Sequence, residues 1–173
     1  MNIFILDKDP ELCAQYHCDK HVLKQIPDIA KILCTVMRES GIPYGYTSSN
    51  KNHPCVKWAQ TADGNFMWLR ELGLELCREY SYRYGKSGGS KHASEHIILD
   101  SYPKNLGDKN HRAKVREPVG MTPPVQCVPA HFKCNDPVKA YRDYYLTEKA
   151  DILAYTKRNV PGWVVEMGMG EHK

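Results

Sequence analysis

Apolar residues recur at helical spacing over a long part of this chain, and this repeat restricts the possible folds more than any other feature of the sequence. Its members lie three or four positions apart, as on one face of an α-helix: Phe66, Leu69, Leu72, Leu76 and Tyr80. The pattern predicts a long helix from about residue 54 to residue 84, with a break or bend at Asp63-Gly64.

Start and stop signals mark further helices. Asp9-Pro10 and Asp136-Pro137 each offer an N-cap carboxylate followed by proline at the first helical position. Pro27 is expected to kink or restart the first helix. Besides the long helix, helices are therefore expected at about residues 10–25, 28–39, 90–99 and 137–158. At 173 residues, the chain is predicted to be mainly α, with a compact single-domain helical fold over residues 1–173.

Residues 103–135 lack any regular pattern and are predicted to form a long, irregular, proline-rich loop within this domain. The loop is basic, and four of its side chains are candidates for contacts with nucleic-acid phosphates: Lys109, Arg112, Lys114 and Arg116. A solvated loop without a ligand is the alternative interpretation.

Composition limits the class of protein. The net charge is +4, which matters only where positive side chains cluster. The apolar first six residues lack a basic flank and run directly into Asp7, so neither a signal peptide nor a membrane span is expected. Seven cysteines without a CxxC pair indicate reduced thiols and a cytoplasmic protein. Cys127 and Cys134 flank His131 at a spacing of no standard zinc module, and neither a metal nor another cofactor is expected.

A stripe of titratable residues marks the first candidate site. On a continuous helix four nitrogen-bearing side chains share one narrow face, with Cys13 before them and Asp28 after them: His17, Lys20, His21 and Lys24. This face suits an anionic ligand and proton transfer. A metal held by the cysteine and the two histidines is a weaker interpretation, since the lysines would repel a cation. A solvated basic helix face is the remaining alternative.

Two further groups of residues are candidates for DNA contacts. Asn52 and His53 precede the long helix, whose free N–H groups attract anions, although Asn52 is equally suited to cap the helix. Near the end of the same helix aromatic and cationic residues alternate, a mixture that fits base stacking and phosphate binding. The most plausible contacts in that stretch are Tyr82, Arg83 and Lys86.

Several short motifs resemble a known family. Residues 11–17, Glu-Leu-Cys-Ala-Gln-Tyr-His, lead into a basic helix that contains Pro27. The run from Asn52 to Val56 follows, with Trp58 soon after it. The arrangement resembles the phage-type pyrimidine dimer DNA glycosylases, also called endonuclease V-type, and their bacterial branch. Residues 136–142 also resemble an uncharacterised phage protein family.

The resemblance implies a compact, mainly helical fold and a glycosylase and lyase mechanism. In that family an N-terminal α-amine attacks C1′ of a damaged pyrimidine nucleotide, forms an imine with the sugar and promotes strand cleavage by elimination. The corresponding amine here belongs to Met1, or to Asn2 if Met1 is removed. The nucleophile is expected to adjoin the stripe described above.

The family also places a glutamate one or two residues before the helix proline, where this sequence has Lys24, Gln25 and Ile26. The acid and base roles are therefore assigned to His17 or His21, with Lys24 as an alternative imine-forming amine. Two carboxylates remain as further candidates: Asp28 and Glu71.

Three functions are carried forward. The first is a DNA repair glycosylase with abasic-site lyase activity on damaged pyrimidines of the cyclobutane dimer type, acting on double-stranded DNA. The second is a phage enzyme that modifies DNA bases or nucleotides on the same scaffold. The third is a non-catalytic nucleic-acid-binding protein. The protein is expected to be a monomer in the cytoplasm, or in that of the host cell if it is viral.

Overall fold

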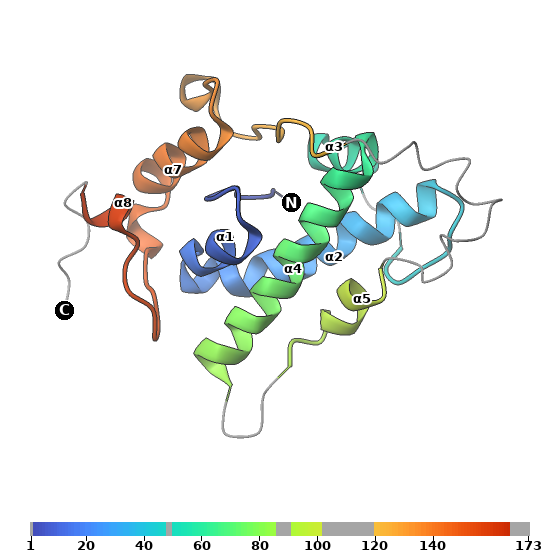
Figure 1. Ribbon diagram of the computed structural model, residues 1–173, viewed down its shortest axis with the longest axis horizontal. Helices are drawn as coiled ribbons and strands as arrows, with labels where there is room; N and C mark the ends of the chain where they lie inside the picture. Colours follow the sequence, from blue (N-terminus) through green and yellow to red (C-terminus); the bar gives the residue numbers. More distant parts are fainter. Residues whose placement is uncertain (1, 48–49, 86–90, 102–119, 167–173) are drawn as a thin grey trace.

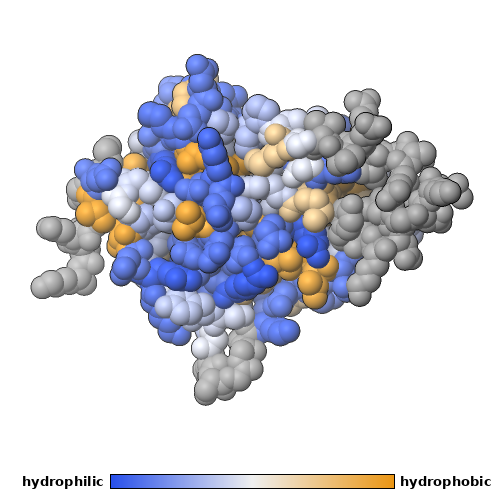
Figure 2. All heavy atoms as spheres, in the orientation of Figure 1, coloured by the Kyte–Doolittle hydropathy of each residue, from blue (hydrophilic) through white to orange (hydrophobic). Residues whose placement is uncertain are grey.

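The computed structural model describes residues 2–47, 50–85, 91–101 and 120–166. In these ranges the chain is mainly α-helical and contains no β-strand, which confirms the predicted fold class (Figure 1). The face shown in Figure 2 is largely hydrophilic, with apolar residues exposed in small separate patches. Nowhere in the described ranges is a helix both long and apolar enough to cross a membrane.

The predicted helix over residues 10–25 is divided in two. Helix α1 (Pro10–Tyr16) is capped by Asp9, whose carboxylate accepts from the N–H of Glu11 at 2.8 Å. His17 and Cys18 are extended, and α2 (Asp19–Glu39) then begins and continues through Pro27. The break therefore lies ten residues before the proline that was expected to cause it.

The long helix also consists of two parts. Helices α3 (Pro54–Thr61) and α4 (Asp63–Tyr84) are separated by extended Ala62, which confirms the expected break at Asp63-Gly64 to within a residue. Helix α4 is the centre of the fold, because α1, α2, α3 and α5 all pack against it (Figure 1). Helix α5 (Glu95–Leu99) is shorter than the predicted 90–99.

The amino-terminal segment crosses the middle of the molecule in an extended conformation. Residues 3–6 are all buried, and Figure 1 shows the segment between α7 and the pair α1 and α2. Phe4 stacks on His21 of α2 with 4.5 Å between ring centroids, and it meets Tyr145 of α7 edge-on at 5.3 Å. Arg142 of α7 holds the end of the segment, donating to the carbonyl of Leu6 at 2.8 Å.

The last part of the chain is less helical than predicted. Residues 120–135, the described part of the proline-rich segment, are irregular apart from the 3-10 turn η1 (Ala130–Phe132). Helix α7 (Pro137–Glu148) ends ten residues before the predicted 158 and is followed by η2 (Ala150–Ile152). Trp163 lies in α8 (Gly162–Val165) and packs edge-on against Tyr16 at 6.1 Å.

Candidate functional site

The cationic stripe predicted at residues 17–24 does not form. His17 lies in the extended link after α1, fully buried, with Nδ1 2.7 Å from the carbonyl oxygen of Cys13. Lys20 and Lys24 are exposed on α2, whereas His21 is buried and bonds to the hydroxyl of Tyr145. The two imidazoles pack around the same rings, Phe4 and Tyr145, whereas the two lysines are exposed, so the four side chains do not form one cationic pocket.

Both histidines are neutral near pH 7. Burial lowers the pKa of His17 to about 3. Burial also lowers the pKa of His21 to about 4, and the nearby positive charges of Lys149 and Lys24 lower it further. The expectation that these rings bind phosphate as cations and exchange protons near neutral pH is therefore wrong.

A different stripe of α2 faces the amino-terminal segment. His21, Gln25 and Asp28 follow one another at one-turn spacing on the helix. His21 contacts Phe4, and the charge of Asp28 acts on His53 at the start of α3. Gln25 therefore lies between these two contacts along the stripe, on the side of α2 that meets the amino terminus.

Asn2 is fixed beside the start of α3. Its Nδ2 donates to the carbonyl oxygen of Cys127 at 3.0 Å. Its Oδ1 lies 3.3 Å from the hydroxyl of Tyr141 and 3.9 Å from the thiol sulfur of Cys55, the second residue of α3. Asn2 is thus anchored between α3, α7 and the segment that contains Cys127.

His53 caps α3, a role for which Asn52 was the expected residue. The His53 Nδ1 accepts from the N–H of Cys55 at 3.2 Å, so the ring proton of the neutral form is on Nε2. Burial and then the charge of the amino terminus lower the pKa of His53, and the carboxylate of Asp28 opposes them. Asn52 itself is exposed.

Unpaired polar atoms accompany this arrangement. Gln25 is 1 % exposed, yet neither Oε1 nor Nε2 has a hydrogen-bond partner within the described part of the chain. The same holds for the buried Oδ2 of Asp28. Buried polar groups in proteins are usually paired, so these atoms are available to a water molecule or to a ligand. Asp28 places a carboxylate one turn after Gln25 on the same face of α2.

The other carboxylate candidate is elsewhere. Glu71 lies on the partly exposed face of α4, where its Oε1 is 3.7 Å from Nη1 of Arg78. This pair is exposed to solvent, with side-chain exposures of 44 % for Glu71 and 65 % for Arg78.

Arg83, a predicted DNA contact, is instead part of the interior. Its side chain is fully buried and pairs with Glu79 at 2.8 Å and with Asp19 at 2.9 Å. Because no part of this side chain is exposed to solvent, it cannot contact a phosphate. Neighbouring Tyr82 is 48 % exposed and carries the guanidinium of Arg158 over its ring at 4.4 Å.

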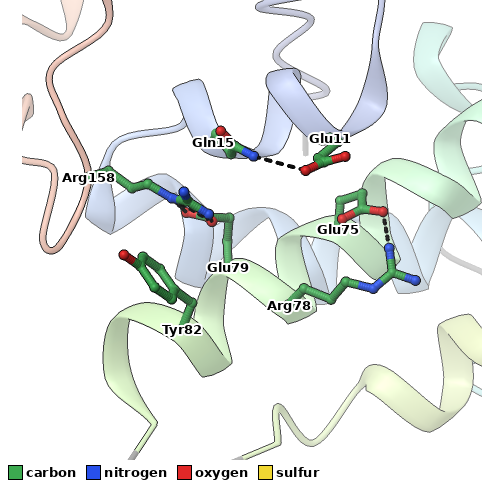
Figure 3. Close-up of a pocket in the computed structure, with 7 residues that line it drawn as sticks. All are labelled: Glu11, Gln15, Glu75, Arg78, Glu79, Tyr82 and Arg158. Atoms are coloured by element: carbon green, nitrogen blue, oxygen red, sulfur yellow. Dashed lines mark hydrogen bonds and ion pairs between the residues drawn. The ribbon is translucent and has the colours of Figure 1, made fainter.

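A cleft of about 160 Å³ lies next to Tyr82, between α1, α4 and the segment with Arg158. Figure 3 shows Glu75 directed at Arg78 and Glu79 directed at Arg158. With Glu11 the lining has three carboxylates against two guanidinium groups. The cleft is therefore not suited to a phosphate group.

Some predicted site residues lie outside the described residues and stay predictions: Met1, Lys86, Lys109, Arg112, Lys114 and Arg116. Within the described ranges no three histidine, cysteine or acidic side chains converge on a possible metal position. Sequence reasoning missed Tyr141 and Cys127 as neighbours of Asn2. No local signal would have found them, because they meet Asn2 from 139 and 125 residues away.

Comparison with known families identifies the family of the first half of the chain. The family model for pyrimidine dimer DNA glycosylase matches residues 1–91, which include Asn2, Gln25, Asp28 and His53. The chain belongs to the pyrimidine dimer DNA glycosylase family. No curated protein and no solved structure gave a match. Family membership points to a glycosylase that acts on DNA.

Proposed function

We propose that the protein is a DNA glycosylase and abasic-site lyase for damaged pyrimidines, with the α-amine at the amino terminus as its nucleophile. The observation that carries the proposal is the placement of Asn2 at the start of α3, on the side of α2 that presents Asp28. A carboxylate, a neutral imidazole and a terminal amine are then neighbours in a partly buried setting.

The α-amine suits this reaction. With an ordinary pKa near 8, about one-tenth of it is unprotonated at pH 7, far more than of a lysine side chain. The amine attacks C1′ of the damaged nucleotide, the bond from C1′ to the base nitrogen breaks, and the base leaves with the electron pair. Opening of the sugar ring gives an imine. Loss of a proton from C2′ then expels the 3′ phosphate and breaks the strand.

Asp28 is the proposed acid and base. Its Oδ2 is buried and unpaired, so the carboxylate is free to accept a proton from the amine and later from C2′. Its charge also favours the cationic intermediates. Gln25 takes the place of a glutamate one turn earlier, where its amide can donate a hydrogen bond but cannot act as a base.

His53 is the proposed contact to the sugar or phosphate. Its Nδ1 is used in capping α3, which leaves the Nε2 proton available as a donor. Because burial lowers its pKa, the ring donates this hydrogen bond as a neutral group. The exposed Asn52 beside it is a further proposed DNA contact, as are Tyr82 and the basic residues of the 103–135 loop.

Strand cleavage of ultraviolet-irradiated plasmid tests this function. The protein is expected to nick irradiated supercoiled DNA and to leave unirradiated DNA intact. Prior treatment with a photolyase, which splits cyclobutane dimers, is expected to remove the substrate. Nicking that ignores irradiation, or that persists after the dimers are split, would contradict the proposed substrate.

A further inference from the structure

Two thiols touch beside the proposed active site. The sulfur atoms of Cys55 and Cys127 lie 3.6 Å apart, although the residues are separated by 72 positions in the chain. Cys55 is fully buried in the first turn of α3, and Cys127 is partly exposed in the extended segment before η1. A disulfide needs about 2.05 Å between sulfurs, so a small movement of this segment closes the gap.

The two thiols differ in reactivity. The hydrogen bond from Cys55 and the charge of Lys133 lower the pKa of Cys127 to about 7, although burial opposes them. That same hydrogen bond and burial raise the pKa of Cys55. Cys127 is therefore the attacking thiolate of the pair, with the buried thiol of Cys55 in position to react next.

The other five cysteines do not combine partial exposure with a lowered pKa and a neighbouring thiol. Four of them are buried, and burial raises the pKa of each thiol: Cys13, Cys18, Cys34 and Cys77. Cys134 is exposed, and its thiol donates to the carbonyl oxygen of Asp136 at 3.1 Å. It serves as an exposed reference thiol outside this pair.

We propose that Cys55 and Cys127 are a redox modification site, which small-molecule disulfides such as oxidised glutathione convert to an intramolecular disulfide. The Cys127 thiolate attacks one sulfur of the oxidant, forms a mixed disulfide and releases one thiol. Cys55 then loses its proton and attacks the Cys127 sulfur, which releases the second thiol. Two protein thiols are oxidised by two electrons, and one oxidant disulfide is reduced to two thiols.

The disulfide would alter the surroundings of the amino terminus. Asn2 donates to the Cys127 carbonyl, and its Oδ1 lies 3.9 Å from the Cys55 sulfur. Oxidation removes the thiol proton of Cys55 and ties the 120–128 segment to α3. An effect on strand cleavage rests on the proposed function, whereas formation of the bond does not.

The test is a peptide map of the full chain under non-reducing conditions after treatment with oxidised glutathione. A cross-linked peptide containing Cys55 and Cys127 is expected, and dithiothreitol should reverse it. Loss of the free Cys127 thiol, which reports the first attack, should become faster with rising pH around a midpoint near 7. At pH 7 the cross-link should form faster than glutathione adds to Cys134, because Cys127 has both a lowered pKa and a second thiol 3.6 Å away.

Three variants of nearly unchanged shape sharpen the test. Cys55→Ser should accumulate a stable glutathione adduct on Cys127, because no second thiol resolves it. Cys127→Ser should leave Cys55 unmodified, and Cys134→Ser should still form the cross-link. Circular dichroism checks that each variant is folded.

Modification of Cys134 without the cross-link, or a cross-link from Cys127 to any other cysteine, would overturn the proposal. Loss of the cross-link in Cys134→Ser would do the same. A cross-link that forms in a protein without nicking activity would support the thiol site and count only against the glycosylase.

Discussion

Arg83 of α4 contacts Asp19, the first residue of α2, with 2.9 Å between Nη1 and Oδ1. The same guanidinium pairs with Glu79 one turn earlier and donates to the backbone carbonyls of Gln15 and His17 at 2.9 Å each. Arg83 thus satisfies the last carbonyls of α1, the first side chain of α2 and a buried carboxylate of its own helix. It holds together three elements that position the amino-terminal segment.

Removal of this side chain is expected to cost a large part of the stability. Arg83→Met would leave the nearly buried carboxylate of Glu79 with one cation fewer, and the free energy of unfolding should fall by about 3–5 kcal/mol. Arg78→Met is the matched control on the same helix, since its ion pairs are exposed, and it should cost less than about 1 kcal/mol. Urea titrations measure both. Equal losses of unfolding free energy in the two variants would show that the buried ion pairs stabilise the protein no more than the exposed ones.

The importance of Arg83 also shows what sequence alone can and cannot predict here. Periodic apolar positions and Asp-Pro caps are local signals, and they correctly predicted a mainly helical fold, the break before α4 and the starts of α1 and α7. No glycine or proline marks the helix break at His17 in the sequence. It depends on Arg83, and on an N–H bond from Asp19 to the carbonyl of Ala154.

In the candidate site, too, local sequence signals identify single residues but not the contacts between distant segments. Asn2, His53 and Asp28 could each be named from the sequence, but their proximity depends on packing between segments that are far apart. The stripe with His17 and His21 was misinterpreted because a helical pattern gives the spacing of side chains and not which face is buried. Phe4 covers His21, and this burial removes its charge.

Acid should unfold the protein through its two buried histidines. Both are neutral in the folded state, with pKa values of about 3 for His17 and about 4 for His21, whereas in the unfolded chain they take up protons from about pH 6.5. Their contribution to stability is therefore complete above pH 6.5 and is lost as the pH falls toward 4. The expected slope is about 1.4 kcal/mol per pH unit for each histidine.

The histidine variants separate this effect from that of the carboxylates. His21→Gln should reduce the slope between pH 6 and pH 4 by one proton, because glutamine does not titrate. His131→Gln, at an exposed position, should leave the slope unchanged. Urea midpoints across this pH range give the slopes, and an unchanged slope in His21→Gln would refute the assignment.

Asp28→Asn tests the proposed base directly. Single-turnover strand cleavage should fall by roughly 10²-fold or more, since proton transfer by a positioned side chain typically contributes that much. Stability should hold, because Oδ2 of Asp28 has no partner to lose among the described residues. Glu71→Gln is the control and should cleave at the wild-type rate. Wild-type cleavage by Asp28→Asn would remove this residue from the mechanism.

His53 should act on the bound DNA and not on the fold of the site. His53→Asn keeps a side chain that can cap α3 and loses the Nε2 donor, so cleavage should fall by roughly ten-fold or more with little change in the melting temperature. His53→Ala would lose the cap as well and should also be less stable by about 1 kcal/mol. If His53→Asn cleaves normally, the imidazole serves only as a cap.

The central claim is that the reacting amine is at the amino terminus beside Asp28 and His53. Borohydride reduction in the presence of abasic duplex DNA traps an imine as a stable adduct, and mass spectrometry of the digested protein identifies the residue that carries it. The account predicts the adduct on the α-amine of the amino-terminal peptide. An adduct on Lys24 or any other lysine side chain, with the α-amine unmodified, would contradict it.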